Sequence, residues 1–574
     1  MSGTLLAFNL LLIFVVAVLG ITYWAARRTR TLADYYVAGH ALPAWQNGIA
    51  IAAVFISAAS VLGLPGLIAL QGFDGLFLLI GVPVSFLVVQ FLLAEPLRNT
   101  GRYTIADAMV HRLRQRPVRL AASVAVLCVC LIHLTAQMMA AGALAQQLFG
   151  LRDRVLGIGP DAVGIVLVGV VAMICVVAGG MLGVTWLQLV KALLLVAVTS
   201  LLVLLLTNRL GFSVGTLLGQ AVARSGRGEA FLRPGLWLGG GLDTLSLAIG
   251  LVLGTAGLPH VMTRFYAVRG TREVRSSVNW AMLVTGVVFL LVSFIGLAAA
   301  ALLGGPRITA VDRSGTLAVP LLARELGGGL STFGGDLLVA CVALTVFATI
   351  LGTVAGLTIA AASSVAHDVY ASVLHPGRRA EAREAAVARL AGVVISVVAI
   401  LVGVALREVN AALVGSVALG LAASSLFPAL ILSLYWRGLN TAGAVAAIVA
   451  GMLSSLVLTA LGSTVIGPSG FILRDARPVL PLAQPAIISV PLAFFAAWLG
   501  TWLSAERPPP TGSFAALRLR ALTGVNQARA DQPRRDLPSG LPSGLPPLSP
   551  PELHMEASPP AVAGPPGPRG PGVR

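Results

Sequence analysis

Charged residues are scarce in this 574-residue chain, because Asp, Glu, Lys and Arg together make up only 11% of it, against a hydrophobic share of 57%. Soluble domains have about a quarter of their residues charged, so the composition excludes that class. The chain also lacks HExxH, GxSxG and Walker A motifs and has no clustered carboxylates. We therefore expect neither an enzyme nor an ATP-driven pump, and we expect no cofactor.

Cysteine is also rare. Cys128, Cys130, Cys175 and Cys341 all fall in apolar segments, and none has the spacing of a metal ligand. The sequence therefore predicts four free thiols.

Apolar stretches fill most of the chain, whose mean hydropathy is +0.91. A hydrocarbon core of roughly 30 Å takes about 20 helical residues, and about 13 stretches reach that length. We therefore predict an all-α, multi-pass membrane protein, surrounded by the lipid bilayer. The predicted spans 1 to 13 cover residues 4–25, 46–71, 75–95, 120–147, 160–180, 183–206, 241–259, 280–303, 333–364, 390–406, 411–434, 441–462 and 484–504.

The distribution of arginine predicts the orientation. With the N-terminus outside and the C-terminus inside, the inner loops carry more arginines than the outer loops, although two outer loops are long. This is the pattern of the positive-inside rule. The net charge of +17 is then mostly a signal of topology, and it indicates no nucleic-acid partner.

The composition changes after Ser504, where proline, glycine and serine dominate. Such a segment cannot bury enough apolar surface to offset the entropy of ordering it. We predict a disordered, Pro-rich cytoplasmic tail over residues 505–574, with a role as a Pro-rich ligand for a partner domain as the alternative.

Two predicted spans are interrupted by small residues and proline. Span 2 contains "ISAASVLGLPG" (Ile56–Gly66), and span 7 contains "LGTAGLPH" (Leu253–His260). Interrupted helices at matching positions of two halves indicate the substrate site of a transporter. Residues 46–206 and 241–434 then form two repeats of opposite orientation. The alternative is that these glycines and prolines merely kink or pack the helices.

Polar side chains are few inside the predicted membrane region. Lys191, the chain's one lysine, lies near the inner end of span 6, where we interpret it as an interface anchor. We interpret His133 on span 4 as a hydrogen-bonded packing residue. Gln137, one turn later on the same face, is the better candidate for a polar contact with substrate. We expect no arginine inside the membrane to bind a carboxylate.

Span 9 places Thr345, Thr349 and Thr353 at intervals of one turn, with Gly352 and Gly356 beside them. Hydroxyl oxygens on such a face suit a hard cation such as Na⁺. The alternative is a packing stripe of small residues, with each threonine bonded back to its own helix. The residues alone leave both interpretations open.

Six segments carry a family resemblance, in chain order over roughly residues 33 to 440. They are "ADYYVAGHALPAWQNGIAIA", "SAASVLGLPG", "GRYTIADAM", "GGMLGVTWLQLVKALLLV", "GTAGLPHVMTRFYAV" and "AHDVYASV". Together they resemble the solute:sodium symporter family, and within it the cation/acetate symporter branch of bacterial monocarboxylate permeases. The resemblance implies a LeuT-like 5+5 inverted repeat over residues 31–440, an extra N-terminal helix within residues 1–30 and two further helices within residues 441–504.

The resemblance also implies a cation site. Backbone carbonyls of Ala53 and Ile56 in span 2 would contribute to it, and so would three positions of span 9, which are Thr349, Gly352 and Thr353. Two positions depart from the family pattern. Gly352 stands where sodium-driven relatives usually have serine, and Val54 where acetate-type relatives have aspartate. The coupling ion is therefore Na⁺ or H⁺.

The N-termini of the half-helices present unpaired N–H groups and positive dipole ends, which suit a carboxylate. We therefore predict that the two interruptions enclose a small monocarboxylate, with an apolar lining that includes Phe55. The predicted substrate-binding residues are Ser57, Ala59, Ser60, Gly63, Gln137, Gly254, Thr255 and Gly257.

The function predicted from these features is cation-coupled symport of a small monocarboxylate such as acetate by alternating access. The alternatives are a symporter of another small solute, such as proline or another amino acid, a transporter-like solute sensor, and a channel.

Overall fold

A computed structural model gives the fold of this chain. It describes residues 3–149, 159–211, 213–236, 240–330, 332–377, 381–406, 411–466, 476–506 and 511–524. These residues belong to one compact unit that spans Met1–Gln527.

Helices make up almost all of this unit. In lipid, apolar faces alone do not hold helices together, and close packing must supply the attraction. Small residues at the contacts allow this, because they let the backbones approach closely. The helices are α1 (Gly3–Ala26), α2 (Leu32–Val37), α3 (Ala44–Phe55), α4 (Leu64–Gln71), α5 (Phe73–Val88), α6 (Ala94–Thr100), α7 (Ile105–Met109), α8 (Gln115–Phe149), α9 (Pro160–Leu210), α10 (Val214–Arg224), α11 (Gly241–Thr255), α12 (Pro259–Met262), α13 (Thr271–Leu302), α14 (Gly305–Val311), α15 (Ala318–Leu326), α16 (Phe333–Ser363), α17 (Glu381–Ala405), α18 (Ala411–Tyr435), α19 (Thr441–Ala460), α20 (Ala486–Leu503) and α21 (Thr511–Thr523). Shorter or irregular turns are η1 (Ala38–His40), η2 (Ala59–Gly63), η3 (Val89–Leu93), η4 (Gly228–Leu232), η5 (Thr263–Ala267) and η6 (Ser364–Leu374).

Every predicted span corresponds to helical chain. Among the residues described, 11 helices are long and apolar enough to cross a bilayer, or 12 if the bent pair formed by residues 44–55 and 59–71 is one span. One of these helices, α9, has 51 residues and covers predicted spans 5 and 6. At 1.5 Å per residue it would be about 76 Å long, more than twice the hydrocarbon thickness. Gly180 divides it, because its φ of 54° and ψ of −159° are not helical.

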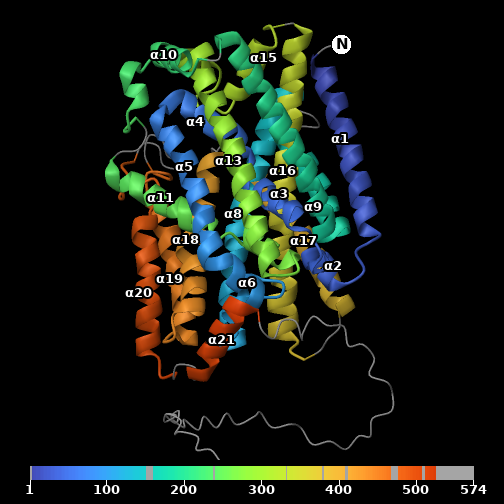
Figure 1. The fold of residues 1–574 in the computed structure, drawn as a ribbon, viewed down its shortest axis with the longest axis vertical. Helices are drawn as coiled ribbons and strands as arrows, with labels where there is room; N and C mark the ends of the chain where they lie inside the picture. Colours follow the sequence, from blue (N-terminus) through green and yellow to red (C-terminus); the bar gives the residue numbers. More distant parts are fainter. Residues whose placement is uncertain are drawn as a thin grey trace, which may run out of the picture. The chain divides into compact units, whose positions relative to one another are not determined.

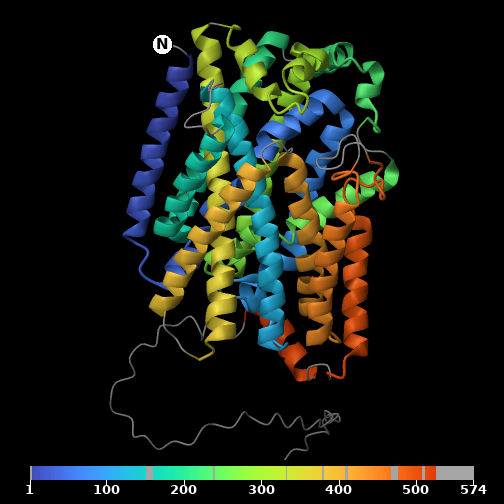
Figure 2. The ribbon, with the colours of Figure 1, turned by 180° about the vertical axis from the view of Figure 1, so that it is seen from behind.

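The long helices run side by side, with α1 at one edge and α20 at the opposite edge (Figures 1 and 2). The N-terminus, α10 and α15 lie at one end of this bundle, and α21 lies at the other. The two long loops that we assigned to the side of the N-terminus contain α10 and α15. They therefore lie at the same end of the bundle as the N-terminus. Which end faces the cell interior stays a prediction.

The part of the predicted tail that the structure describes is not disordered. Residues Thr511–Thr523 form α21, which packs against α6. Asn99 donates a hydrogen bond to the carbonyl of Ala521 at 2.8 Å, and Arg520 donates one to the carbonyl of Asn99 at 2.9 Å. Leu517 and Ala521 are buried in this contact. The prediction of disorder from residue 505 is wrong for this helix, and residues 525–574 lie outside the described part.

The four cysteines are free thiols within the helices, as predicted.

Candidate functional site

The helix of span 2 is broken, as predicted. Helix α3 ends at Phe55, Ile56 is extended with a ψ of 108°, and the chain resumes at Ala59 with a bend of 67°. The backbone N–H of Ser57 faces the hydroxyl of Ser60 at 3.4 Å. Ser57 is buried, whereas Ala59 and Ser60 are half-buried. The break therefore places small and hydroxylated residues around an unwound segment, and whether it borders a binding site stays a prediction.

Span 7 is broken as well, between the end of α11 at Thr255 and the start of α12 at Pro259. Its glycines, however, pack against α18. A Cβ atom at Gly254 would lie 2.4 Å from the carbonyl oxygen of Leu419, and one at Gly257 would lie 2.6 Å from that of Ala422. The Thr255 hydroxyl donates to the carbonyl of Leu251 in its own helix at 2.8 Å. Packing therefore accounts for these three predicted substrate contacts.

Helix α8 contacts both breaks, one turn apart. The amide oxygen of Gln137 accepts a hydrogen bond from the backbone N–H of Ala58 at 3.4 Å. One turn earlier, the His133 ring lies perpendicular to the His260 ring, with 5.5 Å between the ring centroids. His260 follows directly after the second break. The two interruptions therefore meet at α8. Gln137 contacts the first break, and its contact with substrate stays a prediction.

The two histidines between the breaks are buried, with His133 7% and His260 1% exposed. Nδ1 of His133 and both ring nitrogens of His260 have no hydrogen-bond partner among the described residues. We expected His133 to be a hydrogen-bonded packing residue, and this expectation is wrong for its Nδ1, which has no partner among the described residues. His260 was not among the predicted site residues, although it ends the quoted segment "LGTAGLPH".

The residues of the implied cation site surround a lysine. The Lys191 ammonium donates hydrogen bonds to the carbonyls of Ala53 and Ile56, at 2.5 and 2.7 Å, and to the hydroxyl of Thr353 at 3.0 Å. Its side chain is fully buried. The interpretation of Lys191 as an interface anchor is therefore wrong. The available oxygens bind this ammonium, and with the lysine in place they do not also fit a sodium ion.

The other two predicted cation contacts do not reach this ammonium. The Thr349 hydroxyl donates to the carbonyl of Thr345 at 2.7 Å. The carbonyl of Gly352 accepts from the side-chain amide of Gln188 at 2.6 Å. Gln188 was missed in the sequence, although it lies three residues before Lys191 and therefore on the same helix face.

The packing interpretation of span 9 holds for part of it, and the cation-site interpretation stays a prediction. The hydroxyls of Thr345 and Thr349 bond back to their own helix, and a Cβ atom at Gly356 would lie 2.4 Å from Cγ2 of Val54. This is the packing stripe. The Thr353 hydroxyl is instead an acceptor for a cationic group.

An arginine also lies within a membrane span, contrary to expectation. Arg264 is 1% exposed and belongs to the candidate span of residues 241–267. Its Nη1 donates to the Thr185 hydroxyl at 2.6 Å, and its Nη2 has no partner among the described residues. Neither Arg264 nor Lys191 takes part in an ion pair with any residue described. Lys191 and Arg264 are therefore buried basic groups that pair with no carboxylate in the part of the chain that the structure describes.

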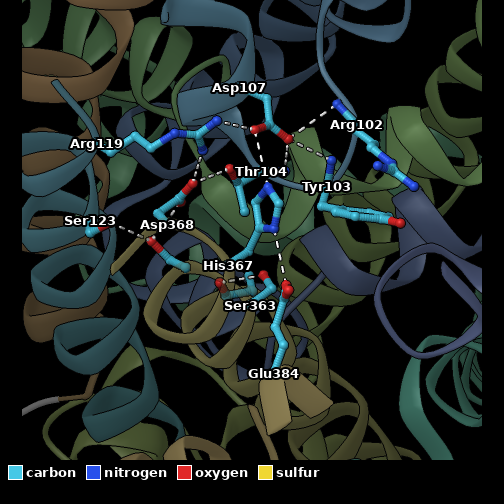
Figure 3. A network of polar contacts seen from close by, with 12 residues as sticks. Arg102, Tyr103, Thr104, Asp107, Arg119, Ser123, Ser363, His367, Asp368 and Glu384 are labelled. Carbon is cyan, nitrogen blue, oxygen red and sulfur yellow. Dashed lines mark hydrogen bonds and ion pairs between the residues drawn. The ribbon is translucent and has the colours of Figure 1, made fainter. Parts of the chain in front are cut away.

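A second polar cluster joins α7, α8, η6 and α17 (Figure 3). Arg119 bridges Asp107 at 2.8 Å and Asp368 at 2.5 Å, and His367 lies between Asp107 and Glu384, at 3.3 and 3.0 Å. The figure shows these side chains pointing toward one another. Asp107, His367 and Asp368 come close enough together for a metal site, but Arg119 already occupies the space between the two aspartates.

Asp107 is the centre of this cluster. Its Oδ2 accepts backbone N–H groups of residues 102, 103 and 104, at 3.2, 2.8 and 3.2 Å. Burial alone would raise the pKa of the carboxyl, but His367, Arg119 and these backbone donors hold the pKa of Asp107 well below its usual range. The cluster is therefore an ion-pair network that ties four elements together.

Comparisons with known proteins agree with this architecture. Residues 35–451 match the model of the Sodium:solute symporter family. The uncharacterized symporter YwcA of Bacillus subtilis (strain 168) is 40% identical over 91% of this chain and 98% of its own length. The monocarboxylic acid transporter of Corynebacterium glutamicum is 38% identical over 92% of this chain and 97% of its own length.

Among solved structures, a substrate-bound, outward-open Na⁺-coupled sialic acid symporter has the same fold. The TM-score is 0.67 at 16% identity, over 88% of this chain and 99% of that chain. This likeness confirms the predicted LeuT-like fold, with several membrane spans. The chain therefore belongs to the sodium:solute symporter family.

Proposed function

We propose that this protein is a secondary active transporter that carries a small monocarboxylate such as acetate, together with a coupling cation, across the membrane by alternating access. One observation carries the proposal: the buried Lys191 ammonium lies beside the break in span 2, and no carboxylate among the described residues pairs with it. An unpaired buried charge is costly. A carboxylate substrate would supply the missing negative charge.

The relatives support the same substrate class. One relative, 38% identical over most of both chains, is named a monocarboxylic acid transporter. Family membership also supports sodium as the coupling ion, while the departures at Gly352 and Val54 leave H⁺ as the alternative. As a transporter, the protein would have no enzymatic activity.

The proposed substrate contacts lie mainly on span 2 and α8. Ser57, Ser60 and Gln137 offer polar groups at the first break, and Ala59 and Gly63 are half-buried small residues on the same segment. The second break would form the opposite wall, although its glycines Gly254 and Gly257 pack against α18 and the Thr255 hydroxyl bonds within α11. His260 joins the proposed site, because its ring nitrogens have no partner among the described residues.

The apolar surroundings favour a short aliphatic chain. The Phe55 ring lies 5.6 Å from that of Phe86 and 6.4 Å from that of Phe289, as centroid distances. Such a cluster offers no hydrogen-bond partners, which a sugar would need. A small acid with one carboxylate and little else is the substrate that this lining suits.

Uptake into proteoliposomes tests the proposal. Labelled acetate, pyruvate and proline are offered under separately imposed sodium and proton gradients. We expect concentrative uptake of a monocarboxylate, and we expect Gln137→Ala to weaken it more than Thr135→Val, a matched change on α8 whose hydroxyl bonds back to Leu131. Uptake of proline but not of the acids would favour the amino-acid symporter. Accumulation of none under either gradient would refute the transporter.

A further inference from the structure

We propose that the Lys191 ammonium is the resident cation of the site that the family resemblance assigns to sodium, so that this transporter works without a sodium ion there. The proposal deepens the proposed function and rests on it, because a role for the site presupposes a symporter.

The geometry of the ammonium leaves no room for a second cation. A lysine ammonium has three N–H donors, and Lys191 has three oxygen acceptors, which are the carbonyls of Ala53 and Ile56 and the hydroxyl of Thr353, all within 3.0 Å. A sodium ion bound to the same oxygens would lie next to the ammonium. Two unit charges of the same sign repel strongly at such a distance in a poorly solvated interior.

Gly352 makes this arrangement sterically feasible. A Cβ atom at residue 352 would lie 3.0 Å from Cδ of Lys191 and 2.9 Å from Oε1 of Gln188. A serine, which the resemblance places here in sodium-driven relatives, would therefore press against both side chains. The absence of a serine hydroxyl at residue 352 and the presence of the buried lysine therefore belong together. The Lys191 side chain takes the place of both the serine ligand and the sodium ion.

Uncharged oxygens alone hold the ammonium. From α3 the acceptors are backbone carbonyls, from α16 the acceptor is the Thr353 hydroxyl, and no described acidic residue pairs with Lys191. His133 and His260 are titratable groups that interact electrostatically with Lys191, and Arg264 interacts with His260. Carbonyls and a hydroxyl are ligands for a hard cation, so a bare ion and an ammonium suit the same donor set.

The first experiment uses the unmodified protein. Its thermal unfolding in detergent is followed in sodium chloride and in choline chloride at the same ionic strength. A ligand that binds only the folded state raises Tm, so we expect no sodium-specific shift. Uptake should likewise proceed when choline replaces sodium. A sodium-specific shift that Thr353→Val abolishes would show that the site binds sodium and would overturn the proposal, whereas a shift that this variant retains arises elsewhere and leaves the proposal standing.

Two substitutions of Lys191 then distinguish the effect of the space that its side chain fills from the effect of the charge that it carries. Lys191→Ala vacates the site, and combined with Gly352→Ser it supplies an additional hydroxyl. Lys191→Met fills the same space without a charge. We expect the double variant to gain a sodium-dependent rise in Tm of a few degrees, and Lys191→Met to gain none. If the alanine variants do not fold, binding of radioactive ²²Na⁺ to the unmodified protein and to Thr353→Val decides the question by the same criterion.

The outcomes separate this proposal from the proposed function. Uptake of a monocarboxylate that depends on sodium bound at Thr353 would refute the tethered cation and leave the transporter intact. Absence of any uptake, with no sodium-specific shift in the unmodified protein and a gained shift in the double variant, would refute the proposed transport function. The assignment of the Lys191 ammonium to the cation site would then stand.

Discussion

Removing Arg119 should destabilise the protein far more than removing an exposed arginine. In the variant Arg119→Met, Asp107 and Asp368 keep their positions but lose the guanidinium between them. The three side chains are 2–9% exposed, so solvent cannot replace the lost contacts. Breaking a buried ion pair by removing one partner costs about 3–5 kcal/mol. We expect a loss of that size in the free energy of unfolding.

A matched control is available on the surface. Arg233 lies 3.3 Å from Glu229, and the two side chains are 74% and 86% exposed. Exposed pairs contribute about 0–1 kcal/mol, so Arg233→Met should be nearly neutral. The assay is denaturant unfolding of both variants in one detergent, followed by intrinsic fluorescence. Equal losses for the two variants, or a loss below about 1 kcal/mol for Arg119→Met, would refute the network as a structural element.

The pH dependence gives an independent check on the same cluster. Because the pKa of Asp107 is lowered in the folded protein, its stabilising contribution is present above the ordinary carboxyl pKa and is lost as the pH falls through the lowered value. Between pH 6 and 8 the Asp107 contribution should therefore be constant. Acid unfolding should be less steep in Asp107→Asn than in the unmodified protein, and an equal steepness would contradict the assignment.

Three further predictions follow from the packing. Gly254→Ala should cost about 1–3 kcal/mol, because its Cβ would meet the α18 backbone at 2.4 Å, whereas Gly286→Ala, which faces open space, should not destabilise in the same unfolding assay. Thr353→Val should destabilise by about 1–3 kcal/mol, because it leaves one ammonium donor unpaired, whereas Thr349→Val should cost less, since it loses only a bond within its own helix. Removing residues 525–574 while keeping α21 should leave uptake unchanged, and loss of uptake would assign a function to that segment.

Local pattern was enough to predict the helices and both breaks. Apolar runs of about 20 residues predict spans wherever they occur, and the small residues and proline of Ile56–Gly66 and Leu253–His260 signal interruption without any tertiary information. The meeting of the two breaks at α8 was not predicted, because it depends on contacts between segments that are far apart in the sequence. The helix α21 was not predicted. Its short helical pattern lies between proline-rich segments, and we assigned the whole region to a disordered tail.

The direction of buried charged side chains could not be predicted from local pattern. Lys191 lies 138 residues from Ala53 and 162 from Thr353 in sequence, and a lysine near the end of an apolar span usually reaches the membrane interface. In the sequence, Arg264 lies after predicted span 7, which ends at residue 259, so we expected it in a loop. The departure at Gly352 was the useful clue, since a missing ligand in a site rich in oxygen implies that something else fills the space.

A tethered cation changes what the transport cycle must accomplish. The Lys191 ammonium holds α3 and α16 together through acceptors on both, as an ion would. A sodium ion can leave when such helices separate, and its departure ends the interaction. The ammonium cannot leave, because it is attached to α9. When α3 and α16 separate, it must find other acceptors, since a buried unpaired charge is costly. Water entering the opened site, or the carboxylate of the proposed substrate, would supply them. The lysine therefore favours the closed arrangement of α3 and α16 whenever the site is dry, and it links their separation to wetting or to substrate binding.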